Sequence, residues 1–195
     1  MKKITLFLFL CLISISCDTS SYYYESGVQN VGLNFKSGKW LLTGIDAPNE
    51  INGELTALVL NKFKRHLHER LDYVYDVKGI MLPKKTPLNP TKSNLAAIKK
   101  GTGYDYLINV KASGISDGNS VDISNGKGKE NEYSSYIVVE VYDLNNLEII
   151  YSRRENGLKK FDKKINKGNM SKLSNKMIIR AFEYIWKNLR KTSIK

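Results

Sequence analysis

Cysteine is scarce in this 195-residue chain, and its placement excludes several kinds of site. The two cysteines are Cys11 and Cys17, both near the amino terminus. If the chain is cleaved before Cys17, the remaining protein has one thiol. It can then form no intrachain disulfide, no C-x-x-C redox site and no cysteine-ligated zinc site. We therefore expect the folded part to depend on an ordinary hydrophobic core.

Histidine is equally scarce. His66 and His68 are the two histidines of the chain, and they fall within a stretch with helical periodicity. Residues two apart on a regular helix point about 200° away from each other, so these two rings cannot hold one metal ion. The sequence predicts neither a metal site nor a bound cofactor.

The sequence has no apolar run of the length that a transmembrane helix needs. Its longest apolar run lies at the amino terminus. The run from Ile4 to Ile13 is shorter than the roughly 20 residues that a transmembrane helix needs. Lys2 and Lys3 precede this run, and small residues follow it. This arrangement is typical of a secretory signal peptide, here residues 1–16.

Two processing routes are open at the predicted cut before Cys17. Ser14 and Ser16 suit an ordinary signal peptidase, which prefers small residues at these positions. The cysteine after the cut instead resembles the lipobox of bacterial lipoproteins, although Ser14 stands where lipoboxes usually carry an aliphatic residue. An unmodified cysteine there would be an exposed, oxidisable thiol, which favours the second route. The resemblance implies that Cys17 receives a diacylglycerol and that its new amine is acylated.

Catalytic motifs are absent from the sequence. It contains no serine–histidine–acid layout, no cysteine nucleophile and no glycine-rich phosphate loop. Asp105 and Glu140 are lone carboxylates within predicted strands, and we expect both to be solvated. The sequence therefore predicts a protein that is not an enzyme.

A long polar segment, residues 113–132, separates two predicted strands. Asp117 and Asp122 suggest calcium, but Asp122 stands where an EF-hand loop needs glycine. Residues 126–129, Gly-Lys-Gly-Lys, lack the frame of a phosphate-binding loop. We expect a flexible loop, with a binding element as the alternative.

Basic residues outnumber acidic ones, 31 against 19, and give a net charge of +12. Cleavage removes Lys2 and Lys3, which leaves 29 basic against 19 acidic residues and a charge of +10. This excess suggests attraction to anionic partners such as lipid head groups and cell-wall polymers. Because many lysines lie beside acidic residues or on the outer faces of predicted helices, we favour the alternative that they serve only solubility. We do not expect nucleic acid as a partner in an exported compartment.

We expect residues 39–195 to form a single α/β (α+β) domain, preceded by a lipidated, flexible spacer at 17–38. Within the spacer, the tyrosines 22–24 can lie at the membrane interface or pack on the domain edge. The domain contains helices with four-residue apolar spacing and strands with two-residue alternation. The predicted strands are 39–45, 73–80, 104–112, 133–143 and 148–154, and the predicted helices are 49–71, 91–100 and 173–190.

The predicted order is β-α-β-α-β-β-β-α. Helices between the early strands call for parallel pairing, whereas the asparagine-containing turn at 144–147 predicts an antiparallel hairpin. The sequence thus predicts one mixed sheet of about five strands with three helices packed on it. Residues 155–170 are expected to form a connection.

Three segments carry a family resemblance: KWLLTGI at 39–45, KKGTGYDYLINVKA at 99–112 and VVEVYDLNNLEIIYS at 138–152. With Cys17, they resemble bacterial envelope lipoproteins built on the fold of the TolB amino-terminal domain. The curli-secretion lipoprotein and the lipoprotein activators of penicillin-binding proteins belong to this group. The resemblance spans about 39–189 and implies a fold more directly than an activity.

These features favour a membrane-anchored, non-catalytic interaction module in the cell envelope, serving cell-wall synthesis or secretion. We expect the outer membrane on its periplasmic side, attachment through the lipid on Cys17, and an envelope protein as partner. One alternative is a glycan or small-ligand binder that uses Trp40, the tyrosines and the basic surface. Another is an oligomeric export component, and the sequence leaves the oligomeric state open.

Overall fold

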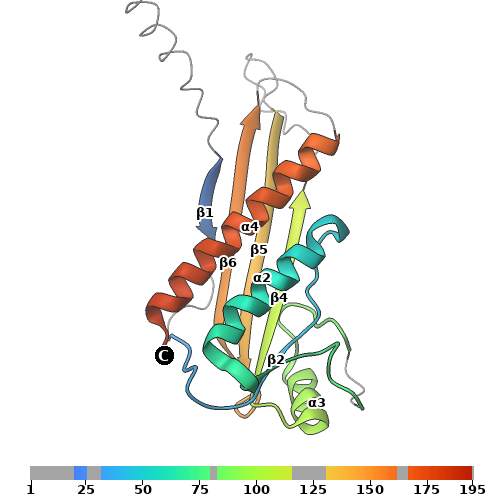
Figure 1. Ribbon diagram of the computed structural model, residues 1–195, viewed down its shortest axis with the longest axis vertical. Coiled ribbons are helices and arrows are strands. Elements are labelled where there is room, and N and C mark those ends of the chain that lie inside the picture. Colours follow the sequence, from blue (N-terminus) through green and yellow to red (C-terminus); the bar gives the residue numbers. More distant parts are fainter. Residues whose placement is uncertain (1–19, 26–31, 80–82, 116–130, 162–166, 195) are drawn as a thin grey trace, which may run out of the picture.

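The computed structural model describes residues 20–25, 32–79, 83–115, 131–161 and 167–194 (Figure 1). The predicted signal peptide, the predicted lipid-attachment residue Cys17 and most of the predicted loop 113–132 lie outside these residues.

One mixed sheet of six strands organises the domain, in the order β1-β6-β5-β4-β2-β3. The strand β2 pairs in parallel with β3 and β4, whereas β4, β5, β6 and β1 pair antiparallel. The strands are β1 (Ser21–Glu25), β2 (Trp40–Leu42), β3 (Leu71–Tyr73), β4 (Tyr106–Ile115), β5 (Asn131–Asp143) and β6 (Glu148–Phe161). The mixed sheet and the order of the predicted elements are confirmed, with one strand more than the five predicted.

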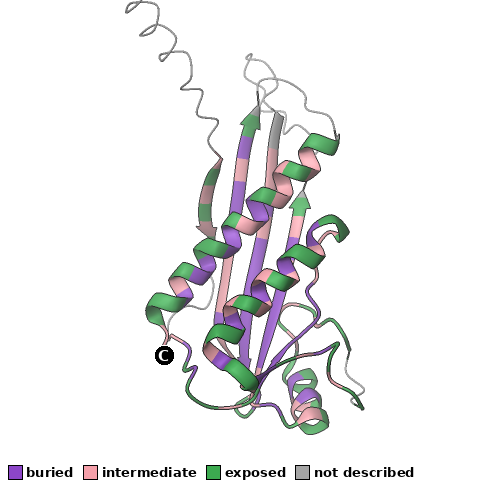
Figure 2. Ribbon diagram, in the orientation of Figure 1, coloured by how far each residue is buried: buried purple, intermediate pink, exposed green. Residues whose placement is uncertain are grey.

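Two long helices, α2 (Asn49–Leu67) and α4 (Lys167–Thr192), lie side by side across one face of the sheet (Figures 1 and 2). A four-residue apolar spacing puts one stripe of α2 into the core: Ile51, Leu55, Val59, Phe63 and Leu67. The apolar residues of α4 that face the sheet are all buried: Met177, Ile178, Ala181, Phe182, Ile185, Trp186 and Leu189. Each buried Val, Leu, Ile, Phe or Met side chain among them contributes about 1.5–3 kcal/mol by leaving water.

The third helix, α3 (Lys92–Thr102), lies on the opposite face of the sheet at one end (Figure 1). The Thr91 hydroxyl caps it by accepting a hydrogen bond from the Asn94 N–H at 3.2 Å, and Gly103, with φ 73°, ends it. Its buried residues Leu95 and Ile98 join a small second cluster with residues of β2, β4 and β5.

Two predicted segments differ most from the structure. The predicted strand 73–80 is replaced by β3 at Leu71–Tyr73, because the chain turns where the Asp76 N–H donates to the Tyr73 carbonyl at 2.8 Å. The predicted connection 155–170 contains the end of β6 and the start of α4. There β6 continues to pair with β5, while Glu155 and Lys159 are buried although they are charged.

The predicted spacer 17–38 is wrong in its described part. Residues 21–25 form β1 at the edge of the sheet, so the tyrosines 22–24 pack on the domain edge. Farther along, Leu33 and Phe35 are each 2% exposed and belong to the main core. Apolar contacts and strand pairing thus hold much of this segment on the domain.

Within the described part of the chain, none of the helices has the length and apolar character needed to cross a membrane.

Candidate interaction surface

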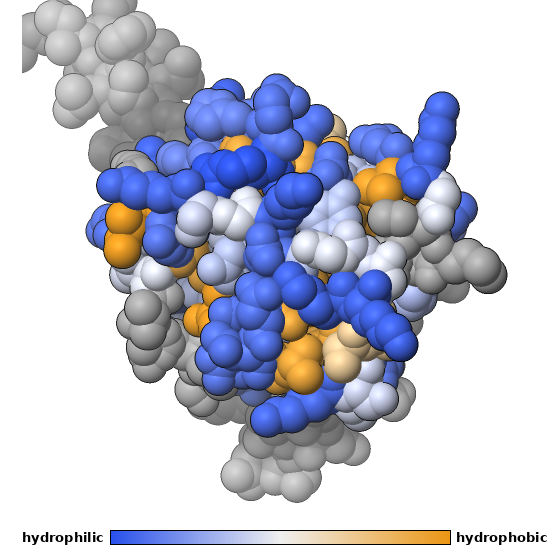
Figure 3. All heavy atoms as spheres, turned by 90° about the horizontal axis from the view of Figure 1, so that it is seen from below, coloured by the Kyte–Doolittle hydropathy of each residue, from blue (hydrophilic) through white to orange (hydrophobic). Residues whose placement is uncertain are grey.

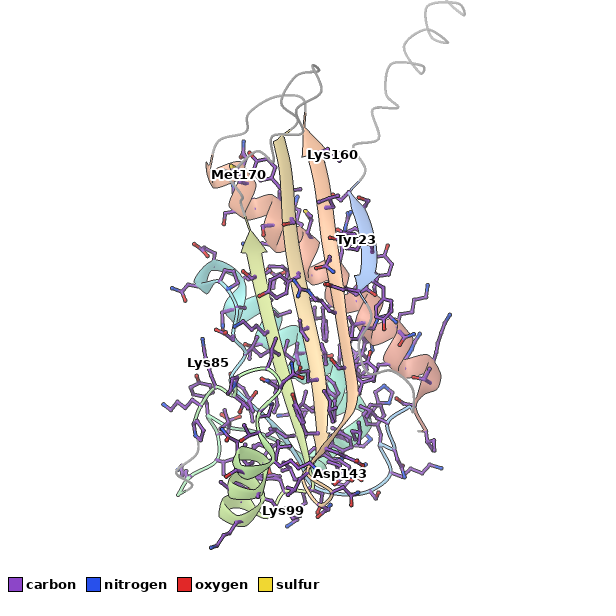
Figure 4. The ribbon with its side chains drawn as sticks, turned by 180° about the vertical axis from the view of Figure 1, so that it is seen from behind. Tyr23, Lys85, Lys99, Asp143, Lys160 and Met170 are labelled. Atoms are coloured by element: carbon purple, nitrogen blue, oxygen red, sulfur yellow. The ribbon has the colours of Figure 1, made fainter. Side chains whose placement is uncertain are left out.

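The face of the sheet opposite α2 and α4 is the candidate functional site. Along β4, β5, β6 and β1, alternate side chains point away from the two helices. We call this surface the open face, and it comprises Lys111, Ser113, Ser134, Tyr136, Val138, Ser152, Arg154, Asn156, Leu158, Tyr23 and Glu25. Among the described residues, no helix or strand covers it, whereas α3 covers the other end of this side (Figure 4).

The register of the strands places these side chains in rows across the sheet. One row contains Lys111, Val138, Arg154 and Glu25 on four successive strands. Directly opposite residues on one face lie about 4.5–5.5 Å apart, so each row forms a continuous strip of side chains. Val138 in this row is 5% exposed although no described helix covers it.

Arg154 is the centre of a polar and aromatic cluster on the open face. Its guanidinium lies over the Tyr136 ring, 4.1 Å from the centroid, and its Nε lies 3.1 Å from a Glu25 carboxylate oxygen. The Arg154 Nε also donates to the Asn156 Oδ1 at 3.1 Å, and the Asn156 amide donates to Glu25 at 3.2 Å. These contacts join β1 to β5 and β6 and hold the arginine in one place.

Two tyrosines give the open face an aromatic character. Tyr23 is 51% exposed on the edge strand, and it lies opposite Asn156. Its neighbour Tyr22 points to the other face, where its ring packs on Tyr184 of α4 with 5.3 Å between centroids. Alternation along β1 therefore separates an aromatic side chain available for contact from one that anchors the strand.

A strap, residues 84–90, borders the open face at the end near α3. The Gly44 N–H donates to the Lys84 carbonyl at 2.6 Å, and the Asn109 amide donates to the Pro87 carbonyl at 3.2 Å. Lys85 pairs with Asp46 at 2.8 Å, and this ion pair holds the pKa of the Asp46 carboxyl below its ordinary value. The strap is thus attached to β4 and to the segment that follows β2.

Glu140 lies beneath the strap and is 2% exposed, contrary to the expectation that it would be solvated. The Tyr142 hydroxyl donates to its carboxylate at 2.5 Å, and the Asn89 N–H donates to the Tyr142 oxygen at 3.1 Å. Burial raises the pKa of the Glu140 carboxyl, and hydrogen bonds from Tyr142, Asn89 and Asn109 oppose that effect. The carboxyl therefore links the strap to the sheet.

Asp105 also links two parts of the fold. Its carboxylate accepts a hydrogen bond from the Lys39 N–H at 2.9 Å and pairs with Lys99 of α3 at the same distance. The bond from Lys39 and then the pairing with Lys99 lower the pKa of the Asp105 carboxyl. Asp105 thus joins the start of β2 to α3.

Trp40 does not reach the surface, contrary to its suggested role in glycan binding. It is 0% exposed, stacks on Tyr106 with 4.3 Å between ring centroids, and donates from Nε1 to the Ser37 carbonyl at 3.0 Å. A ligand on the domain surface therefore cannot contact its ring.

The two histidines have different surroundings. His66 stacks on Phe35 with 5.5 Å between ring centroids and lies against Trp186, whereas His68 follows the end of α2. In the part of the chain that the structure describes, no group of three His, Cys, Asp or Glu side chains is arranged to hold a metal ion. Asp117, Asp122 and the Gly-Lys segment 126–129 lie outside that part.

Sequence reasoning missed β1, and with it Tyr23, Glu25 and the cluster around Arg154. A signal was present, because a run of three tyrosines has high β-propensity. The open face itself could not be found from the sequence, since alternation does not say which side of a sheet the helices will cover.

Comparisons with protein families and with curated protein sequences found no match. Among solved structures, the chain is similar to lipoprotein GNA1162 from Neisseria meningitidis, with 9% identity and a TM-score of 0.38, over 75% of this chain and 99% of that chain. It is also similar to the LpoB carboxy-terminal domain from Escherichia coli, with 15% identity and a TM-score of 0.35, over 67% and 86% of the two chains.

A third similar structure is a homologue of the neuraminyllactose-binding hemagglutinin from Helicobacter pylori. Its identity is 13% and its TM-score 0.46, over 86% of this chain and 94% of that chain. These structural likenesses are distant both in sequence and in TM-score, and they carry no activity with them.

Proposed function

We propose that this protein is a non-catalytic interaction module of the bacterial cell envelope, anchored through lipid on Cys17, and that its open face binds a partner protein. The observation that carries the proposal is the sheet face that α2 and α4 leave uncovered. Tyr23, Tyr136 and Arg154 lie on it, and tyrosine and arginine are enriched among residues that dominate protein–protein binding energy.

The arrangement of these side chains suits a protein better than a small ligand. Sites for small molecules are concave, whereas neighbouring strand residues form a broad surface with one side chain per strand in each row. The contacts of Arg154 with Glu25 and Tyr136 fix its guanidinium before a partner arrives, which lowers the entropy cost of binding.

The proposed anchor accounts for the single cysteine of the mature chain. We expect Cys17→Ser to release the protein from the membrane fraction while the domain stays folded. A variant that stays with the membranes after a high-salt wash would show that the basic surface, and not the lipid, attaches the protein.

Binding through the open face is tested with the full, membrane-extracted protein. We expect Tyr23→Ala combined with Tyr136→Ala to weaken retention of the partner at least about tenfold, since each truncated anchor residue costs on the order of 1 kcal/mol or more. Tyr75→Ala is the matched control, because Tyr75 is 48% exposed, lies against Tyr73 and Lys84, and follows β3 at the sheet edge opposite β1. Equal loss in both variants, or in neither, would contradict the role of the open face.

A further inference from the structure

The position of β1 fixes where the chain enters the domain. Ser21 pairs with Leu158, three residues before the end of β6, and β1 then runs antiparallel to β6 (Figure 1). The same end of the molecule carries Lys160 on β6 and Met170 in the first turns of α4 (Figure 4). The chain therefore enters the domain at the end where β6 finishes and α4 begins, which we call the entry end.

Little chain separates β1 from the proposed lipid-attachment residue. Only Asp18, Thr19 and Ser20 lie between Cys17 and Ser21. A fully extended chain spans at most about 3.3–3.6 Å per residue, so the Cys17 Cα lies within roughly 14 Å of the Ser21 Cα. A lipid on Cys17 cannot let the domain move far from the membrane surface unless β1 leaves the sheet.

Several contacts keep β1 in the sheet. All five of its residues are paired with β6, and the Tyr22 ring packs on Tyr184. Glu25 adds an ion pair with Arg154 at 3.1 Å. The attachment of the chain to the domain is therefore a paired strand at the entry end and not a long, unpaired tether.

The other end of the molecule lies far from this point. The strand β5 has 13 residues, which at about 3.3 Å each extend roughly 43 Å from the entry end to Asp143. Near Asp143 lies α3 with Lys99 (Figure 4). Seen from this end, hydrophilic side chains predominate, with small apolar patches between them (Figure 3).

We propose that the entry end lies against the lipid head groups and that the sheet stands upright on the membrane, with α3 and the turn after Asp143 farthest from it. This inference rests on the proposed lipid anchor at Cys17. The exposed Lys160 and Lys172 at the entry end suit an anionic lipid surface. In this orientation the open face is directed sideways, so a partner must present its binding site within roughly 40 Å of the membrane.

The test compares two exposed lysines at opposite ends of the domain. Lys160→Cys and Lys100→Cys are made separately in the full, lipidated protein, where acylated Cys17 does not react with a thiol-directed dye. Each labelled protein is bound to vesicles of phosphatidylethanolamine and phosphatidylglycerol that carry a head-group-labelled acceptor lipid. We expect energy transfer to be several-fold greater from position 160 than from position 100.

Inserting twelve Gly and Ser residues between Thr19 and Ser20 provides the matched control. Such a linker has an end-to-end distance of roughly 20 Å, so we expect it to reduce the difference between the two positions. Equal transfer from both positions in vesicle-bound protein without the insertion would overturn the upright orientation but leave the anchor in place. Failure of the lipidated protein to bind vesicles would overturn the anchor and the orientation together.

Discussion

At the scale of single residues, Glu140 is a buried carboxyl that holds the strap onto the sheet. It occupies an alternating position in β5, where the other side of the strand faces the helices, and a polar residue there is normally solvated. The strap 84–90 instead covers it, and Tyr142 and Asn89 supply hydrogen bonds. Glu140 is buried by contacts with a segment about fifty residues away in the sequence. The alternation of polar and apolar residues in β5 therefore could not reveal its burial.

Burial of Glu140 predicts a pH dependence of stability. Because its pKa is raised in the folded protein, the native state holds this proton more tightly than the unfolded chain, whose carboxyl titrates near 4.5. The contribution of this group to the free energy of unfolding is therefore greatest below pH 4.5 and falls as the pH rises through the folded-state pKa.

Glu140→Gln removes this titration. We expect its free energy of unfolding, measured in urea across this pH range, to lack the decrease that Glu140 causes in the wild-type protein. Identical pH profiles for the two proteins would show that Glu140 does not titrate with a raised pKa.

At the scale of the elements, adjacent tyrosines on β1 have opposite roles. Tyr22 packs between Tyr184 and the backbone of Gly157, whereas Tyr23 is half exposed on the open face. We expect Tyr22→Ala to lower the free energy of unfolding by about 1–2 kcal/mol and Tyr23→Ala to change it by less than about 0.5 kcal/mol. Denaturant unfolding measures both, and equal losses would contradict the alternation of β1.

The helix α4 approaches β4 closely where both residues are small. A Cβ on Gly114 would lie 2.1 Å from the Ser174 Oγ, so Gly114→Ala should cost about 1–3 kcal/mol through overpacking. Combining it with Ser174→Gly should recover part of that loss, beyond the cost of glycine in the helix.

Gly101→Ala in α3 is the control for this pair, because a Cβ there meets nothing within 4 Å. We expect it to leave stability unchanged or raise it by up to about 1 kcal/mol. Thermal unfolding of the three variants distinguishes steric crowding at Gly114 from a general intolerance of alanine.

Elements with a strong, local pattern could be predicted from the sequence. The four-residue spacing in α2 and the seven core residues of α4 are found buried, because one apolar stripe is enough to specify which side of a helix packs. The short strands β3 and β1 have no comparable pattern of apolar residues that would show which side packs. The three-residue β3 and the edge strand β1 depend on pairing with distant segments, which composition alone does not encode.

At the scale of the whole molecule, the two faces of the sheet are unlike each other. Two helices and the main core cover one face, and the described chain leaves most of β4, β5, β6 and β1 uncovered on the other (Figures 2 and 4). The proposed anchor and the paired β1 would present this open face sideways from an upright domain. Together these features predict a protein that holds a partner close to the membrane.

Photo-crosslinking in intact cells tests this account most directly. A photoreactive amino acid replaces Tyr23 on the open face or Tyr184 on the helical face, two tyrosines of similar exposure, 51% and 49%. Illumination followed by mass spectrometry should identify one envelope protein joined to position 23 and not to position 184. Crosslinking of the same protein at position 184 alone, or at both positions equally, would contradict the open face as the binding surface.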